Sequence, residues 1–186
     1  MEKNLSQTNP PLHRVAVIGP ESTGKTTLSQ ALATHFQTHW VPEYMRDYCQ
    51  VLWDESQQIC RWEDLLPIAQ GQMESENRLA QTARDVLICD TCLWELVVYA
   101  YLYFGECPPD LEAATLASHY DTVLLTDIDV PWVADDLRDK PQEREKVLAL
   151  FQNFLKRNHI SFTLLSGSHE QRLQQAVNLI EHALIK

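Results

Sequence analysis

The sequence has little basic charge and no long apolar run, and each shortage excludes a class of protein. Its 186 residues include 15 lysines and arginines against 26 aspartates and glutamates, which gives a formal net charge of −11. Nucleic acids and anionic membranes bind basic surfaces, so we expect neither as a partner. Because no stretch of about 20 apolar residues occurs, we expect no membrane-spanning helix. The polar N-terminus does not resemble a secretory signal.

Cysteine is also scarce, and its spacing does not indicate a metal site. The chain has five cysteines, of which only Cys89 and Cys92 form a close pair. A zinc site would need a second pair of ligands at similar spacing, and a redox pair would usually open a helix after the first strand. We therefore expect reduced thiols in a protein core and a cytoplasmic location.

The length and the order of the predicted elements indicate one domain. Residues 1–12 are polar and end in two prolines, so we expect a flexible N-terminal tail followed by a single domain over residues 13–186. Short apolar runs that predict strands alternate with segments of helical periodicity, which is typical of a parallel sheet with helices on both faces. The predicted strands are 13–18, 39–42, 86–89, 122–126 and 161–165. The predicted helices are 25–37, 43–52, 67–84, 93–104, 110–118, 142–156 and 169–184.

The most informative segment runs from Gly19 to Thr27 and reads GPESTGKTT. It fits the phosphate-binding pattern G-x-x-x-x-G-K-[ST], with Gly19, Gly24, Lys25 and Thr26 at the fixed positions. It also follows a predicted strand and opens a predicted helix, which is the context that such a loop requires. Only five glycines occur in the chain, and two of them, Gly19 and Gly24, occupy the two glycine positions of this pattern. The alternative is an ordinary strand-to-helix turn.

A loop of this kind predicts a nucleoside triphosphate and Mg²⁺ as ligands. Backbone N–H groups wrap the polyphosphate, and the helix that follows adds its positive end. Lys25 would reach the β- and γ-phosphates, and the Thr26 hydroxyl would bind Mg²⁺. A dinucleotide site would instead need G-x-G-x-x-G, which is absent. The residues expected to bind the nucleotide are Gly19, Glu21, Ser22, Thr23, Gly24, Lys25, Thr26 and Thr27.

Two other segments carry carboxylates that would meet the loop at the carboxyl edge of the sheet. Asp90 ends the third predicted strand, where it would hold Mg²⁺ or accept a proton from an attacking hydroxyl. The alternative is a helix N-cap. In WVPEYMRDY, Glu43 would accept hydrogen bonds from sugar hydroxyls, and Arg46 would steady a transferred phosphoryl group. Their alternative role is a solvated pair at a helix start.

The polar loop at residues 127–141 predicts a lid. Arg138 and Arg144 lie six residues apart, and a mobile loop with arginines would close on the triphosphate and exclude water. The alternative is surface charge at a helix start. Trp132 and Tyr44 lie near the predicted cleft and would stack on a flat base, although core packing is the better interpretation for any single aromatic residue.

Five segments, in this order along the chain, resemble the P-loop kinase domain of the NadR family, the ribosylnicotinamide kinases of NAD metabolism. They are GPESTGKTTL, PEYMRDY, IAQGQ, LICDT and DIDVPWVADDLRD. The resemblance runs from about Arg14 to the C-terminus. The set of five in order is considerably more specific than the loop alone.

The resemblance implies a three-layer P-loop NTPase fold similar to nucleoside monophosphate kinases, with a five-stranded parallel sheet in the order 2-3-1-4-5. It also implies transfer of a phosphoryl group from ATP to the 5′-hydroxyl of nicotinamide riboside, which gives nicotinamide mononucleotide. Lys25, Asp90 and Arg138 would then be catalytic, Thr26 and Asp90 would bind Mg²⁺, and Arg144 would contact the nucleotide. The small-molecule acceptor would contact Glu43, Tyr44, Arg46, Asp90 and Trp132.

The sequence departs from this family in two ways. Family proteins carry an adenylyltransferase domain, and some a DNA-binding domain, for which this chain has no room, so we expect the kinase step alone. Asp136 stands where a glycine is often found in the lid, which affects the expected lid geometry and acceptor choice. Two rival functions stay open: a kinase of another nucleoside or small metabolite, and a non-catalytic nucleotide-binding regulator. An empty second cleft over Asp90 and Glu43 would favour an enzyme.

Overall fold

The structure is a computed structural model that describes residues 5–134, 137 and 142–185. Its centre is one parallel sheet of five strands in the order β2-β3-β1-β4-β5, which confirms the order implied by the family resemblance. The pairing between β1 and β3 sets Val17 opposite Asp90, so the carboxyl ends of these two central strands lie side by side. The strands are β1 His13–Ile18, β2 Trp40–Val41, β3 Val86–Asp90, β4 Thr122–Thr126 and β5 Thr163–Leu165.

Seven α-helices among the described residues connect and cover the strands, at the positions that the sequence pattern predicts. Pro67 lies in the first turn of its helix, where a missing N–H leaves no hydrogen bond unmade. A short 3₁₀ helix, η1 Trp62–Asp64, precedes that turn. The helices are α1 Lys25–His35, α2 Tyr44–Ser56, α3 Leu65–Ala80, α4 Leu93–Phe104, α5 Pro109–Ala117, α6 Arg144–Arg157 and α7 His169–Leu184.

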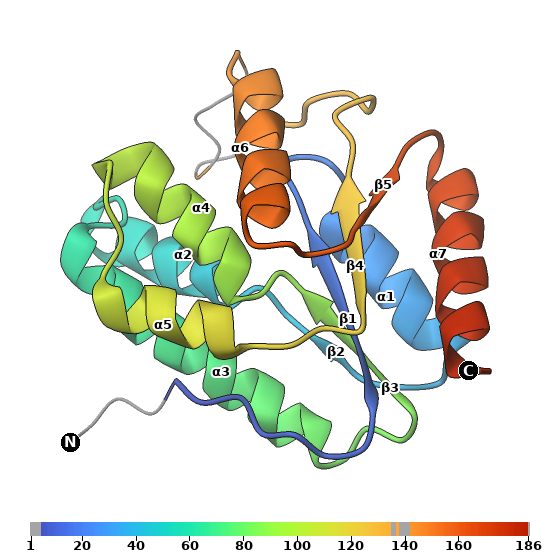
Figure 1. Ribbon diagram of the computed structural model, residues 1–186. Helices are drawn as coiled ribbons and strands as arrows, with labels where there is room; N and C mark the ends of the chain where they lie inside the picture. Colours follow the sequence, from blue (N-terminus) through green and yellow to red (C-terminus); the bar gives the residue numbers. More distant parts are fainter. Residues whose placement is uncertain (1–4, 135–136, 138–141, 186) are drawn as a thin grey trace.

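Both faces of the sheet are buried, because successive side chains of each strand point to opposite sides. On β1, Val15 and Val17 pack with residues of α1 and α7, while Ala16 and Ile18 pack with residues of α4 and α6. Figure 1 shows α1 and α7 together on one side of the sheet, with α4 and α6 on the other. The result is a three-layer arrangement with the phosphate-binding segment at its carboxyl edge.

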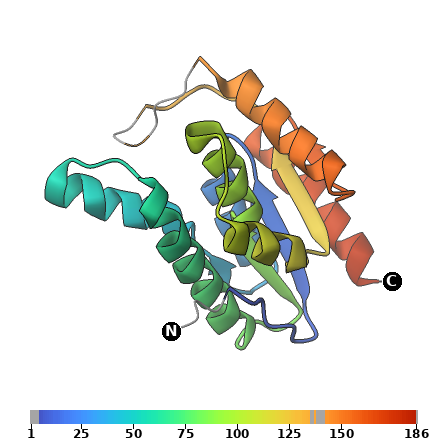
Figure 2. The ribbon, with the colours of Figure 1, turned by 60° about the vertical axis from the view of Figure 1, so that its left-hand side comes forward.

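Helix α4 is apolar around most of its circumference because it is covered on several sides. It packs against α3, α5 and α6, and a further apolar cluster joins it to α2. Figure 2 shows α2 and α3 on the side of the sheet opposite to α7. In the described part of the chain, α4 and the other helices all lack the combination of length and apolar character that crossing a bilayer requires.

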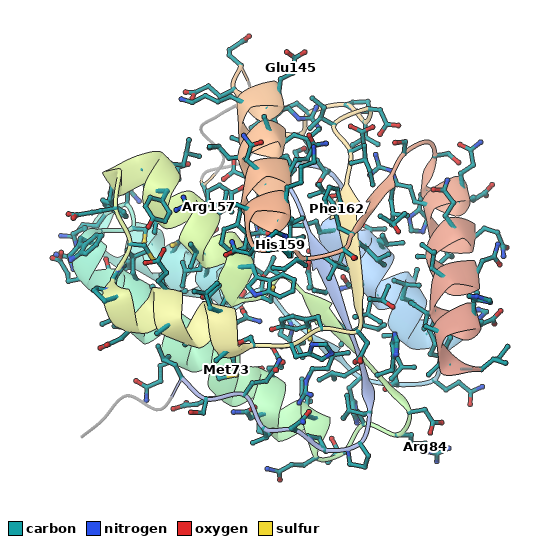
Figure 3. The ribbon with its side chains drawn as sticks, viewed as in Figure 1. Met73, Arg84, Glu145, Arg157, His159 and Phe162 are labelled. Atoms are coloured by element: carbon teal, nitrogen blue, oxygen red, sulfur yellow. The ribbon has the colours of Figure 1, made fainter. Side chains whose placement is uncertain are left out.

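Helix α6 is amphipathic and is oriented with its charges matched to the helix dipole. Val147 and Phe151 point into the core, whereas Glu145 lies in the first turn and Arg157 in the last (Figure 3). Acidic groups at a helix N-terminus and basic groups at its C-terminus are each stabilising by about 0.3–1 kcal/mol. This helix begins shortly after residues 127–141, the segment that the sequence predicts as a lid. Its packing therefore holds the chain that follows that segment in place.

A buried ion pair joins β1 to α3, and a hydrogen bond from the N-terminal segment reaches the same carboxylate. The Arg14 Nε atom lies 3.2 Å from Glu76 Oε1, and both side chains are almost fully buried. Glu76 also accepts hydrogen bonds from Tyr120 Oη, at 2.8 Å, and Gln7 Nε2, at 2.6 Å. Burial raises the pKa of Glu76, and these partners oppose that rise. Gln7 belongs to the segment that composition predicts as a tail, and the boundary of the domain at residue 13 stays a prediction.

We predict that Glu76→Ala lowers the free energy of unfolding by about 3–5 kcal/mol, since it leaves the Arg14 guanidinium buried without its counter-charge. Urea denaturation measures the change. The matched control is Glu74→Ala on the exposed side of the same helix, which should shift the stability by less than about 0.5 kcal/mol. A loss of under about 1 kcal/mol for Glu76→Ala would contradict the role given to this pair.

Candidate functional site

The phosphate-binding segment adopts the wrapped conformation that its glycines allow. Gly24, which precedes α1, has a φ of +82°, and a Cβ atom there would meet nothing within 4 Å. Gly19 has a φ of +144°, and a Cβ atom there would come within 2.4 Å of Thr126 Oγ1. The loop is therefore pressed against the end of β4 on one side and open on the other, as a cradle for an anion must be.

Hydrogen bonds from distant elements fix the backbone of this loop. Thr23 Oγ1 donates to Pro20 O at 2.7 Å, and it lies 2.6 Å from Thr126 Oγ1. Arg172 on α7 donates from Nη1 to Thr23 O at 2.7 Å and from Nη2 to Asp127 O at 3.0 Å. The sequence analysis missed Arg172. Its signal was a basic residue four positions before the buried Ala176, on the apolar face of an amphipathic helix.

Lys25 points back over the loop from the first turn of α1. Its Nζ donates to Gly19 O at 2.9 Å and to Pro20 O at 3.1 Å, and it lies 3.2 Å from Glu95 Oε1. The other carboxylate oxygen of Glu95 accepts from the Gly19 N–H at 3.2 Å. The Glu95 carboxylate thus binds both the Lys25 ammonium group and the Gly19 N–H, as an anionic phosphate oxygen would. Sequence analysis missed Glu95, although it is an isolated acid within an apolar helix.

Burial and the nearby carboxylates have opposite effects on the charge of Lys25. Burial favours a neutral amine, but the carboxylates of Glu95, Glu43 and Asp90 outweigh it, so the pKa of Lys25 is raised. Burial also raises the pKa of Glu95 to about 8, and Lys25 opposes that rise. Lys25 therefore carries its positive charge at neutral pH, which a phosphate-binding lysine requires.

Asp90 lies at the end of β3, directly beside β1. It is almost fully buried, and neither carboxylate oxygen has a hydrogen-bond partner of good geometry among the described residues. Burial raises the pKa of Asp90 to about 6, while the Thr26 hydroxyl and the Lys25 ammonium oppose this rise. The N-cap of α4 is Cys92, so Asp90 does not fill the capping role that was its alternative. A buried carboxylate without partners is costly unless a ligand uses it.

A cavity of about 280 Å³ extends from the loop toward α2 and α4. The structure brings Glu43 and Arg46 to the same cavity as the loop, as the sequence predicts. One end is polar, and the other is lined by apolar and sulfur-containing side chains. The polar lining includes Glu21, Ser22, Thr23, Lys25, Thr26, Thr27, Glu43, Arg46 and Glu95. The apolar lining includes Met45, Cys49, Cys60, Leu65, Leu96 and Phe104.

Five of the predicted site residues that the structure describes do not line this cavity: Gly19, Tyr44, Asp90, Trp132 and Arg144. Asp90 is buried beside it, close enough to Thr26 and Lys25 for both to act on its pKa. The Tyr44 ring lies against Gly71 of α3, and Trp132 and Arg144 line a separate, small cleft. Arg138, predicted as the leading lid residue, and Asp136 lie outside the described residues.

Arg144 and Trp132 nevertheless connect the lid segment to the phosphate-binding loop. Arg144 donates from Nη1 to Val130 O at 2.8 Å and from Nη2 to Ser22 O at 3.3 Å. Its guanidinium carbon lies 5.8 Å from the centre of the Trp132 ring, within the range of a cation–π contact. The Val133 N–H donates to Ser22 Oγ at 2.7 Å. Residues 130–133 therefore lie over one edge of the loop.

The residues present fit a triphosphate with a magnesium ion. The loop offers backbone N–H groups and a charged lysine around an open space, and the buried Asp90 carboxylate has no hydrogen bond of good geometry among the described residues. No group of three or more His, Cys, Asp or Glu side chains in the described ranges would hold a metal ion by itself. This suits Mg²⁺, which is usually bound by one or two protein groups together with phosphate oxygens and water. Thr26 and Asp90 are the groups that the sequence predicts for this role.

Comparison with known proteins identifies the family. Residues 14–172 match the family described as AAA domain. The chain belongs to the AAA domain family. The trifunctional NAD biosynthesis/regulator protein NadR of Salmonella typhimurium is 29% identical over 173 residues, and that of Escherichia coli is 28% identical. Each alignment covers 91% of this chain but 42% of the relative, so the chain spans less than half the length of these relatives.

Solved structures confirm the fold of this family member. A crystal structure of NadR protein in complex with NR superposes with a TM-score of 0.78 at 20% identity, covering 95% of this chain and 52% of that chain. A thymidylate kinase from Candida albicans superposes with a TM-score of 0.64 at 16% identity, covering 94% and 93%. The chain therefore has the P-loop fold of the nucleoside monophosphate kinases, and its resemblance to NadR, indicated by five sequence segments, is confirmed.

The packing of Tyr44 on Gly71 gives a test of the α2–α3 contact beside the cavity. A Cβ atom at Gly71 would come within 2.2 Å of the Tyr44 ring. We predict that Gly71→Ala lowers the free energy of unfolding by about 1–3 kcal/mol through this overlap. In a Tyr44→Ala background the same change should instead be stabilising by up to about 1 kcal/mol, because alanine is the better helix former. Urea denaturation of the four proteins completes the cycle, and stabilisation of the wild type by Gly71→Ala would contradict the contact.

The buried carboxylate of Asp90 predicts a pH-dependent cost to stability. Because its pKa of about 6 lies above the usual aspartate value of 3.8, the folded protein binds this proton more tightly than the unfolded chain. Stability is therefore lost as the pH rises from about 4 to 6. We predict that Asp90→Asn raises the free energy of unfolding at about pH 7.5 by up to about 3 kcal/mol, and that this gain shrinks below about pH 4.

Urea denaturation across that pH range measures the effect. The matched control is Asp85→Asn at an exposed position just before the same strand, which should change stability by less than about 0.5 kcal/mol. A gain for Asp90→Asn that is equal at every pH, or a loss at about pH 7.5, would contradict the buried carboxylate.

Proposed function

We propose that the protein is a kinase that transfers the γ-phosphoryl group of ATP to the 5′-hydroxyl of nicotinamide riboside. The observation that carries this proposal is the single cavity that joins the phosphate-binding loop to Glu43 and Arg46. A triphosphate on the loop and a nucleoside at the apolar end would meet near Asp90. The NadR relatives, whose described activities lie in NAD biosynthesis, support the choice of this acceptor.

The triphosphate would bind the loop amides between Gly19 and Thr26, with Lys25 leaving Glu95 to contact phosphate oxygens. Lys25 already carries its charge in a buried space, so little rearrangement beyond the side chain itself is needed. Mg²⁺, held by Thr26 and Asp90, would neutralise phosphate charge when bound. Positioning and charge neutralisation of this kind account for most of the catalysis of phosphoryl transfer.

Asp90 is the group proposed to orient or deprotonate the acceptor hydroxyl. Its pKa of about 6 leaves most of the carboxylate ionised at neutral pH while keeping it basic enough to accept a proton. Arg46 lines the cavity, where it would steady the transferred group. The proposed lid, which would exclude water, includes Trp132 and Arg144. It also includes Arg138, which lies outside the described residues.

The acceptor end combines an apolar surface with carboxylates. Glu43 lines the cavity at the start of α2, where it would accept hydrogen bonds from the ribose hydroxyls. Glu43 and Asp90 contribute negative charge to this region, which favours an acceptor with a cationic ring over a neutral nucleoside. A nucleotide-binding regulator would need no such second compartment, and the presence of one favours an enzyme.

We predict that Lys25→Ala abolishes ADP release in the presence of nicotinamide riboside, with a loss of at least 1000-fold in kcat/KM, because the ammonium no longer reaches the phosphates. A coupled assay for ADP measures the rate. The matched control is Lys146→Ala on the exposed face of α6, which should keep at least half of the wild-type rate. Turnover by Lys25→Ala at the wild-type rate would contradict the assignment of the loop.

The choice of acceptor is tested by a panel of nucleosides in the same assay. We expect nicotinamide riboside to give a kcat/KM at least tenfold above adenosine, thymidine and deoxyadenosine, because only its ring is cationic. If another nucleoside turns over while nicotinamide riboside is inert, the proposed acceptor is wrong, whereas the phosphate-binding assignment stands.

A further inference from the structure

Two cysteines, Cys49 and Cys60, meet at the apolar end of the cavity. Cys49 lies on α2 and is buried, and Cys60 lies in the segment between α2 and η1 and is half-buried. Both line the cavity and belong to the same apolar cluster. The two thiols are close enough for each to shift the pKa of the other. The two thiols therefore line the same cavity as the phosphate-binding loop.

The surroundings of the pair make one thiol the more reactive. A hydrogen bond from Cys49 lowers the pKa of Cys60, and the nearby Arg61 acts in the same direction, against the effects of burial and Asp64. The same contact raises the pKa of Cys49, as do its burial and the nearby Glu43 and Asp64 carboxylates. A thiolate is the nucleophile in thiol chemistry, so Cys60 is the attacking group and Cys49 the group that follows.

The other cysteines differ from this pair in position and environment. Cys89 and Cys92, the pair that sequence spacing singles out, are fully buried in the core, and burial raises the pKa of both. Cys107 is half-buried outside this cavity lining, and burial together with Glu112 raises its pKa to about 11. Among the described residues, only Cys49 and Cys60 combine mutual contact with access to the cavity.

We propose that Cys49 and Cys60 form a thiol modification site, at which a low-molecular-weight disulfide converts the pair into a protein disulfide. The Cys60 thiolate attacks one sulfur of the reagent, forms a mixed disulfide and expels one thiolate, which takes up a proton. Cys49 then loses its proton to water and attacks the Cys60 sulfur, which breaks the mixed disulfide and expels the second thiol. In balance, two protein thiols and one reagent disulfide give one protein disulfide and two reagent thiols.

The consequence for activity rests on the proposed function. A bond between the two sulfur atoms fixes α2 to the segment before η1 and removes two adaptable thiols from the apolar end of the cavity. The phosphate-binding loop lies at the other end and keeps its contacts. The disulfide would therefore weaken use of the acceptor while leaving nucleotide binding unchanged.

The first experiment treats the full chain with oxidised glutathione and maps the thiols by mass spectrometry after proteolysis without reduction. We expect linked peptides that contain Cys49 and Cys60, with Cys89 and Cys92 still free. Failure to find this link, whether Cys60 is unmodified or carries only glutathione, would overturn the proposal. This result does not depend on any catalytic activity.

Single substitutions test the order of attack. Cys49→Ser should stop at the mixed disulfide, with one glutathionyl group on Cys60. Cys60→Ser should leave Cys49 at least tenfold slower to react, because Cys49 is buried and loses the partner that attacks first. Cys107→Ser should form the Cys49–Cys60 link at the wild-type rate. Equal rates of modification in Cys60→Ser and in the wild type would contradict Cys60 as the attacking thiol.

The second experiment compares reduced and oxidised forms of the wild-type protein. We expect the linked protein to lose at least tenfold in kcat/KM for nicotinamide riboside, to bind ADP with unchanged affinity, and to recover after dithiothreitol. Unchanged turnover in fully linked protein would overturn the effect on the acceptor. If the reduced protein phosphorylates no acceptor, the proposed function fails, while peptide mapping still decides the modification site.

Discussion

The site is organised around the charge of one buried ammonium group. Lys25 lies almost fully out of water and is stabilised by loop carbonyl oxygens and by the Glu95 carboxylate. Without those partners its charge would be too costly to bury, and a neutral amine would not attract phosphate. The overall charge of −11 is therefore compatible with a polyanionic ligand, because the positive potential is local. Loop amides, a helix terminus and Lys25 supply it inside an acidic protein.

The fold supplies the remaining members of the site through the carboxyl ends of neighbouring strands. β1 leads into the loop, and β3 ends at Asp90. β4 ends at Thr126, whose hydroxyl contacts Thr23 of the loop. Arg172 adds a link from the final helix to the loop and to the segment after β4. Each side chain is held by an element that is itself packed in the sheet or against it. Little reorganisation is needed to present these groups to a ligand, which is the condition for electrostatic catalysis.

The sequence predicted the parts of this arrangement that depend on local pattern. The loop, the alternation of strands and helices, and the convergence of Glu43 and Arg46 with the loop follow from motif spacing and from the rules of parallel sheets. Contacts between distant residues were not predictable in the same way. Glu95 contacts Gly19 across 76 positions, and Arg172 contacts Thr23 across 149 positions. Likewise, sequence spacing singles out Cys89 and Cys92 as a pair. Cys49 and Cys60 are ten residues or more apart in sequence and become a pair only through folding.

The central claim is that the cavity brings a triphosphate and a nucleoside hydroxyl together for direct transfer. Phosphorus nuclear magnetic resonance of the protein with ATP, Mg²⁺ and nicotinamide riboside tests it most directly. The account predicts a new phosphomonoester resonance that grows in step with ADP and matches nicotinamide mononucleotide, with little inorganic phosphate. Growth of inorganic phosphate alone, or unchanged ATP in protein that binds it, would contradict a kinase with this acceptor.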